Sequence, residues 1–103
     1  MLVSSYEIKD GKGNIKEYDV NGIMIFEGEY LNGERNGKGK EYDNFYEILI
    51  FEGIYLNGEK WNGKEYYENG KLRFEGEYLN GKRWNGKVKE YYDNGKLKIE
   101  GNI

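Results

Sequence analysis

The chain has 103 residues, a length that fits one small domain. Charged residues make up 34 % and nearly cancel to a formal net charge of -3, which argues against a nucleic-acid partner and against attraction to anionic membranes by charge alone. The absence of Cys and His excludes disulfides, thiolate chemistry, and the usual zinc sites and nucleophile–base pairs.

The first residues, from Met1 to Ser5, hold too short an apolar run for a signal peptide. No stretch of the sequence approaches the length of a membrane-spanning helix. We therefore expect a soluble, cytoplasmic protein. Aromatic residues reach 17 %, including eleven Tyr, so we expect Tyr rather than Leu to supply the core.

A triplet that consists of an aromatic or aliphatic residue, then Glu, then Gly recurs along the chain. It reads FEG at Phe26, Phe51 and Phe74 and IEG at Ile99, at intervals of 25, 23 and 25 residues. Self-similarity in this range predicts a repeat array. We expect a single domain over residues 1–103, with units at roughly 6–25, 26–50, 51–73 and 74–98 and a partial unit at 99–103.

Each unit predicts two strands joined by tight turns. In the fourth unit, aromatic and small residues alternate with Glu over 74–78, which is the period of a strand. Asn80-Gly81 then predicts a turn, 87–92 a second strand, and 93–95 (Asp-Asn-Gly) the turn into the next unit. The sequence therefore predicts an all-β fold, an elongated single-layer antiparallel meander of successive β-hairpins.

The glycines that lie between aromatic residues are predicted to let the aromatic rings pack against the backbone. If Tyr30 lies opposite Gly37, its ring covers bare glycine backbone, and the same register places Glu27 opposite Lys40 on a solvated face. We expect a side chain at Gly76 to clash with the flanking rings. The structural repeat positions are Phe26, Gly28, Tyr30, Phe51, Gly53, Tyr55, Phe74, Gly76 and Tyr78.

Further aromatic residues have no obvious place in a core. Two Trp occupy equivalent predicted turns, and two Tyr-Tyr pairs must place rings on both faces of the sheet. Two interpretations remain open: rings stacked for stability, or a repeated aromatic surface that binds a partner. The candidate partner-binding aromatics are Trp61, Trp84, Tyr66, Tyr67, Tyr91 and Tyr92.

The units resemble MORN repeats. FEGEY at 26–30, Asn32-Gly33 and the Gly-Lys-Gly of 37–39 follow that family's aromatic-x-Gly-x-aromatic, Asn-Gly and Gly-x-Gly pattern. The endings EYYENGKL and EYYDNGKL are closer still to the variant MORN repeats of the YwqK antitoxin-like group. The resemblance covers residues 11–103 and implies an elongated, twisted sheet with a scaffold or interaction role. A membrane-lipid partner is implied by the resemblance only.

No residue pattern predicts a catalytic, metal or cofactor site. Paired carboxylates such as Glu75 and Glu77 recur in every unit, which is typical of a solvated face rather than of a glycosidase pair. We expect a non-enzymatic scaffold or protein-interaction module whose partner the sequence does not identify. Two alternatives stay open: a ligand-binding module that holds a sugar, choline or lipid headgroup on its repeated aromatics, and an antitoxin-like protein.

The last residues, Ile99 to Ile103, form the first strand of an unfinished unit. A strand with no successor leaves an open sheet edge, which invites pairing with another chain. We expect self-association through this terminal strand or through an aromatic face.

Overall fold

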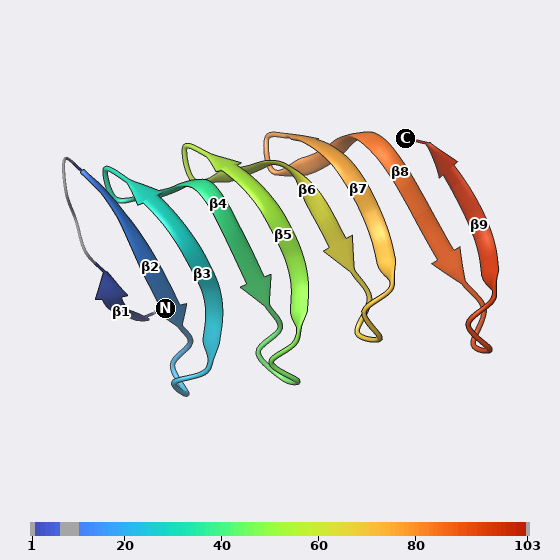
Figure 1. The fold of residues 1–103 in the computed structure, drawn as a ribbon, viewed down its shortest axis with the longest axis horizontal. Coiled ribbons are helices and arrows are strands. Elements are labelled where there is room, and N and C mark those ends of the chain that lie inside the picture. The colour runs from blue at the N-terminus through green and yellow to red at the C-terminus, as the bar shows by residue number, and fades with distance from the viewer. Residues whose placement is uncertain (1, 7–10, 103) are drawn as a thin grey trace.

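The structure is a computed structural model that describes residues 2–6 and 11–102. Within these residues the chain forms nine strands in one antiparallel sheet, in sequence order (Figure 1). The strands are β1 (Leu2–Tyr6), β2 (Lys12–Tyr18), β3 (Met24–Leu31), β4 (Glu34–Tyr42), β5 (Leu49–Leu56), β6 (Glu59–Tyr66), β7 (Leu72–Leu79), β8 (Lys82–Tyr91) and β9 (Leu97–Asn102).

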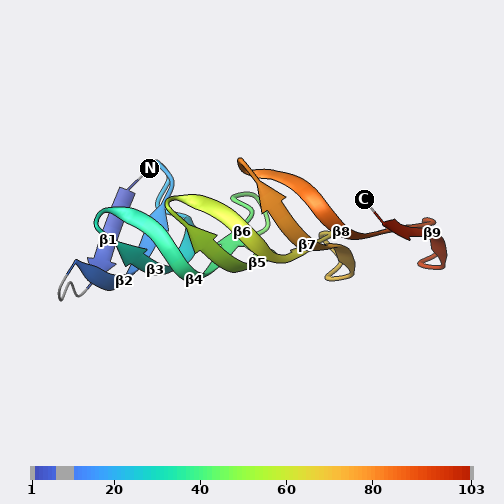
Figure 2. The ribbon, with the colours of Figure 1, turned by 90° about the horizontal axis from the view of Figure 1, so that it is seen from above.

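The sheet is a single layer that coils along its long axis (Figure 2). Its extents are 46 × 29 × 16 Å, so it is about three times as long as it is thick. The predicted all-β meander of hairpins is confirmed. Among the described segments, none forms a helix of the length and apolar character that a bilayer crossing requires.

Two kinds of connection alternate along the sheet, on opposite edges (Figure 1). Asn-Gly turns join β3 to β4, β5 to β6 and β7 to β8 along the upper edge, and both turn residues have positive φ, the geometry that suits a right-twisted hairpin. Longer loops line the lower edge. There the side chains of Asp19, Asp43, Asn69 and Asn94 accept hydrogen bonds from nearby backbone N–H groups.

Two β-bulges recur in each full repeat, and they correct part of the sequence prediction. One lies just before each FEG or IEG triplet, at Ile25, Ile50, Arg73 and Lys98. The other follows the Asn-Gly turn, and Trp61 and Trp84 are its extra residues. The prediction that these Trp lie in turns is wrong, because they belong to β6 and β8. Bulges increase local twist, which fits the coiled shape of the sheet.

The buried rings lie on one face of the sheet, called here the ring face because it carries the Phe of each FEG triplet. The exposed fractions of Phe26, Phe51 and Phe74 are 0 %, 1 % and 0 %. Tyr55 and Tyr78 complete this core. Each ring contacts its neighbours edge to face, with centroids 5.4 to 5.7 Å apart across the strands.

A line of glycines crosses the sheet beneath these rings. From β3 to β8 each strand places one glycine directly opposite the glycine of the next; they are Gly28, Gly39, Gly53, Gly63, Gly76 and Gly86. Ring atoms of Phe26 and Tyr55 stand 2.7 and 2.8 Å from the position that a Cβ on Gly39 would occupy. Aromatic rings thus cover glycine backbone, as the sequence predicts in kind.

The predicted partner of Tyr30 is wrong. Tyr30 pairs with Arg35 and not with Gly37, because the bulge after the turn shifts the register, whereas Glu27 does lie opposite Lys40. The expected clash at Gly76 also involves other atoms than the sequence predicts. A Cβ there would stand 2.2 Å from the carbonyl oxygen of Asn85 and 2.6 Å from the Cα of Gly86, so the obstacle is the facing backbone rather than the flanking rings.

Substituting Gly76→Val should lower the free energy of unfolding by about 3 kcal/mol, because backbone atoms in mid-sheet cannot move aside as a flexible side chain can. Gly101→Val is the matched control. It alters the corresponding triplet of β9, where a Cβ would meet no atom within 4 Å. Urea unfolding followed by intrinsic fluorescence measures both, and equal losses in the two variants would contradict the crowding argument.

Candidate interaction surfaces

A ladder of carboxylates, phenols and cations lies above the rings of the ring face. Glu17 is fully buried and accepts hydrogen bonds from the Tyr30 hydroxyl at 2.6 Å and from Nε and Nη2 of Arg35 at 2.8 and 2.9 Å. Glu65 repeats the arrangement with the Tyr78 hydroxyl and with Nε and Nη2 of Arg83 at 3.0 and 2.7 Å. The same trio of acid, phenol and cation therefore recurs two repeats apart.

Glu41 lies in the ladder between Glu17 and Glu65. It accepts hydrogen bonds from the Tyr55 hydroxyl and from Nη1 of Arg35 at 3.0 Å, and its other oxygen lies 3.6 Å from Nζ of Lys60. Arg35 thus bridges the carboxylates of two successive repeats. Lys60 stands where the other repeats have Arg, and it cannot form the paired hydrogen bonds of a guanidinium.

The cations of the ladder also lie over the faces of the buried Phe rings. The guanidinium carbon of Arg35 lies 4.1 Å from the ring centroid of Phe26, and Nζ of Lys60 lies 4.3 Å from that of Phe51. Arg83 covers Phe74 at 5.0 Å. These contacts combine cation–π attraction with burial, and they exclude water from rings that have no second sheet above them.

The ladder shifts the pKa values of Glu17, Glu65 and Tyr30. Burial acts to raise the pKa of Glu17, but hydrogen bonds from Arg35 and Tyr30 and the Arg35 charge outweigh it, so the pKa lies below its ordinary value. The pKa of Glu65 is lowered in the same way by Arg83 and Tyr78. Burial and the Glu17 carboxylate raise the pKa of Tyr30 to about 12.

Every buried side-chain N or O atom in the described part of the chain has a hydrogen-bond partner. The buried polar atoms of the ladder are therefore all paired, which indicates a structural role. Sequence reasoning missed it, although a signal was present. The triplet Lys-Glu-Tyr recurs at 16–18, 40–42, 64–66 and 89–91, and the Glu of the first three copies supplies the three carboxylates.

Stability should fall at both ends of the pH range. A carboxylate with a lowered folded pKa stabilises the fold fully above its unfolded pKa of about 4.3, and this is lost as the pH falls through the folded value. Tyr30, with its raised pKa, stabilises below about pH 10, and this is lost as the pH rises toward about 12. Thermal unfolding midpoints measured from acid to alkaline pH test both losses of stability. A midpoint unchanged from neutral pH down to about pH 3 would refute the loss at acid pH.

Substituting Lys60→Arg should raise the free energy of unfolding by about 1 kcal/mol, because a guanidinium can donate two hydrogen bonds to Glu41 and still cover Phe51. Lys64→Arg is the control, since the Lys64 side chain is 49 % exposed and pairs with Glu75 only at 3.7 Å. Urea denaturation compares the two variants. If both changes are equal, the ladder geometry is not the source of the gain.

The two predicted Trp lie at the upper edge of the sheet and are half exposed. The exposed fractions of Trp61 and Trp84 are 50 % and 57 %, and those of Leu56 and Leu79, which end the preceding strands, are 47 % and 54 %. We call these four residues the Trp edge. Because a bulge inserts each Trp into its strand, neither ring joins the core.

The four predicted Tyr lie toward the opposite, lower edge, where they line one open hollow of about 950 Å³. Tyr67 and Tyr91 meet edge to face at 5.9 Å, and the Tyr67 hydroxyl donates to the carbonyl of Lys89. The Tyr66 hydroxyl donates to Glu52 at 2.5 Å. These three have structural contacts, while Tyr92 is 56 % exposed.

Sequence reasoning also missed a pair of exposed rings in the β4–β5 loop. Phe45 is 80 % exposed and Tyr46 57 %, and their rings meet edge to face at 4.8 Å. Both follow Asp43, whose carboxylate accepts hydrogen bonds from their backbone N–H groups. The available signal was that this Phe-Tyr pair interrupts the repeat and has no counterpart in the other units.

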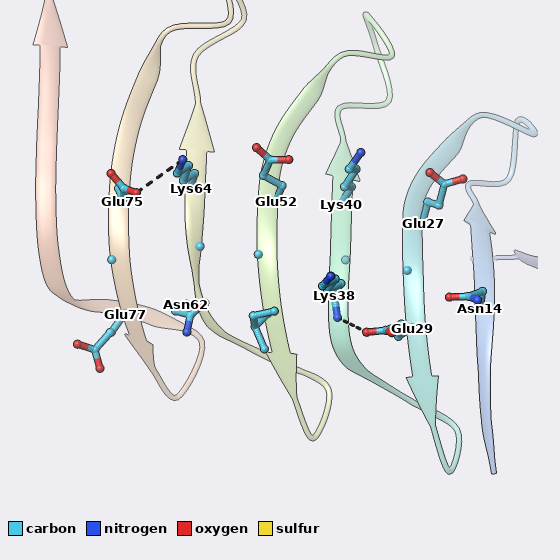
Figure 3. A pocket seen from close by; sticks show the side chains of 16 residues that line it. Asn14, Glu27, Glu29, Lys38, Lys40, Glu52, Asn62, Lys64, Glu75 and Glu77 are labelled. Atoms are coloured by element: carbon cyan, nitrogen blue, oxygen red, sulfur yellow. Dashed lines mark hydrogen bonds and ion pairs between the residues drawn. The ribbon is translucent and has the colours of Figure 1, made fainter. Parts of the chain in front are cut away.

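The face opposite the ring face carries a groove that runs across the strands, and we call it the groove face (Figure 3). The groove has a volume of about 740 Å³ and is lined by five members of the glycine line, from Gly28 to Gly76, and by charged side chains on both sides. Along one side the cross-strand neighbours alternate in sign; they are Lys16, Glu27, Lys40, Glu52, Lys64, Glu75 and Lys87. The carboxylates predicted to be solvated are among them.

These features define a repeat protein built of β-hairpins. Residues 62–80 and 84–103 match the family model described as MORN repeat variant. The match supports the MORN repeat family, whose repeats are generally associated with scaffolds for protein and membrane-lipid interactions. No curated protein and no solved structure matches the chain.

Proposed function

We propose that the chain is a non-enzymatic scaffold that acts in the cytoplasm and presents the Trp edge to a protein partner. The observation that carries this proposal is that Trp61 and Trp84 are both half exposed at equivalent bulges. Trp is the residue most enriched among interface positions that dominate binding energy. Two such rings on strands β6 and β8 are two strand spacings apart, about 10 Å, and offer paired anchors on a rigid sheet.

The carboxylates support a non-enzymatic role. Those of the ladder are paired with Arg, Lys and Tyr, and those of the groove recur along the sheet with no single position set apart. Among the described residues, no three His, Cys, Asp or Glu cluster in a way that could hold a metal ion.

The tyrosine hollow gives little support to the alternative of choline or another cationic headgroup. The rings of Tyr67, Tyr91 and Tyr92 already lie near cations of the chain itself, namely Arg73 at 5.4 Å, Lys71 at 4.6 Å and Lys98 at 5.8 Å. A cationic ligand would have to displace these groups from the ring faces. A protein partner at the Trp edge requires no such displacement.

The finer assignment to the YwqK antitoxin-like group forms part of the proposal. It rests on the endings EYYENGKL and EYYDNGKL, and it would make the partner a toxin. A membrane-lipid partner follows from the family resemblance alone.

The double variant Trp61→Ala, Trp84→Ala should lose the partner that the parent chain captures from its source cells, by more than about tenfold in Kd once that partner is purified. The fold should survive, because both rings are half exposed and lie outside the core. Pull-down followed by calorimetry with the purified partner makes the measurement.

Phe45→Ala, Tyr46→Ala is the matched control, since it removes two exposed rings from the opposite edge. The control should bind as the parent does. Equal binding by the Trp variant and the parent would reject the Trp edge as the interaction surface.

A further inference from the structure

Along the row from Lys16 to Lys87, the charges of the groove face change sign from each strand to the next. Two carboxylates flank the glycine of β3 and two more that of β7, whereas two ammonium groups flank the glycine of β4. β5 contributes Glu52, β6 contributes Lys64, and β8 contributes Lys87. Alternation of this kind balances each strand against its neighbours. If this pattern is shifted by one strand, each charge lies over a charge of opposite sign.

This pattern has a geometric consequence for a second copy of the chain. A two-fold axis parallel to the strands and midway between β5 and β6 would place β4 over β7, β5 over β6 and β3 over β8. Lys40 would then face Glu75, Glu52 would face Lys64, and each pair would occur twice. Because any such axis between adjacent strands joins strands of opposite sign, the face is complementary to itself, as an isologous interface requires.

The second side of the groove alternates less completely, because three of its six residues are uncharged. Its row contains Glu29, Lys38, Ile54, Asn62, Glu77 and Asn85. Under the same axis Lys38 faces Glu77, Ile54 faces Asn62, and Glu29 faces Asn85. Under this axis no pair of like charges meets in either row. An axis placed on a strand would instead bring like charges face to face all along the first row.

Lys16, Glu27, Lys64 and Glu75 are available to a partner, whereas Glu52 already accepts a hydrogen bond from the Tyr66 hydroxyl at 2.5 Å. The ion pairs within the sheet are long, with 3.7 Å between Lys16 and Glu27 and between Lys64 and Glu75. The side chains of these four residues are 42 to 50 % exposed. Such pairs hold their members weakly, so a facing copy could engage the same groups.

The sheet also offers enough area. The product of its extents of 46 and 29 Å, about 1300 Å², is the upper limit for the area of one face, because the sheet coils. A stable interface needs about 800 Å² from each partner. Contact over the central strands β3 to β8, which carry the glycine line, would meet that requirement.

We propose that the groove face is a self-complementary docking surface on which a second copy of this chain binds, with the two glycine lines facing each other and opposite charges paired strand by strand. This surface is separate from the Trp edge, so the two proposals stand independently. It also differs from the terminal strand and the aromatic face, through which the sequence predicts self-association.

The test uses charge reversal and analytical ultracentrifugation of the full chain. Lys40→Glu, Lys64→Glu makes the central row acidic, and Glu52→Lys, Glu75→Lys makes it basic. The parent should be a dimer at low salt that weakens as salt rises. Each variant alone should dimerise at least about tenfold more weakly, and an equimolar mixture of the two should restore the dimer. Restoration by mixing cannot arise from unfolded chains, so it separates lost docking from lost folding.

The control Lys82→Glu, Lys96→Glu makes the same change in net charge at exposed positions outside the groove and should dimerise as the parent does. Trp61→Ala, Trp84→Ala should also remain dimeric. A parent that stays monomeric at low salt would overturn the proposal. So would variants that both dimerise as the parent does, or a mixture that stays monomeric while both variants keep the parent's thermal midpoint.

Discussion

The constraint on which this structure depends is that a single-layer sheet has no second layer to cover its core. The chain meets it by covering the three buried Phe rings of the ring face with its own long polar side chains. Arg35 lies over Phe26 while its guanidinium binds Glu17 and Glu41. The apolar stem and flat head of Arg serve burial and hydrogen bonding together. Stability therefore rests on the ladder as much as on the rings.

The glycine line extends the same solution across the sheet. On the ring face, rings lie against the glycine backbone of a neighbouring strand; Phe51, for example, covers Gly63. On the groove face, the same line runs along the bottom of the groove between rows of charge. One set of small residues thus allows close packing on one face and leaves a regular charged surface on the other. The rings cannot be repositioned without altering that surface.

The two edges and the groove face form separate exposed surfaces. The bulges after the Asn-Gly turns expose Trp61 and Trp84 at the upper edge, while Tyr67 and Tyr91 tie the lower loops together. Repetition multiplies each feature along a rigid sheet, which suits a scaffold better than a site that acts once. The MORN repeat variant match over the C-terminal units agrees with this organisation.

The sequence by itself determined the strands, the turns and the repeat, because alternation and Asn-Gly signals act over a few residues. It also placed Glu27 opposite Lys40. Only the tertiary structure decided that Tyr30 pairs with Arg35, that Trp61 lies in a strand, and that Glu17 is buried. The reason is that bulges shift the register, and the partners of Glu17 stand 13 and 18 residues away, on strands whose alignment no local pattern specifies.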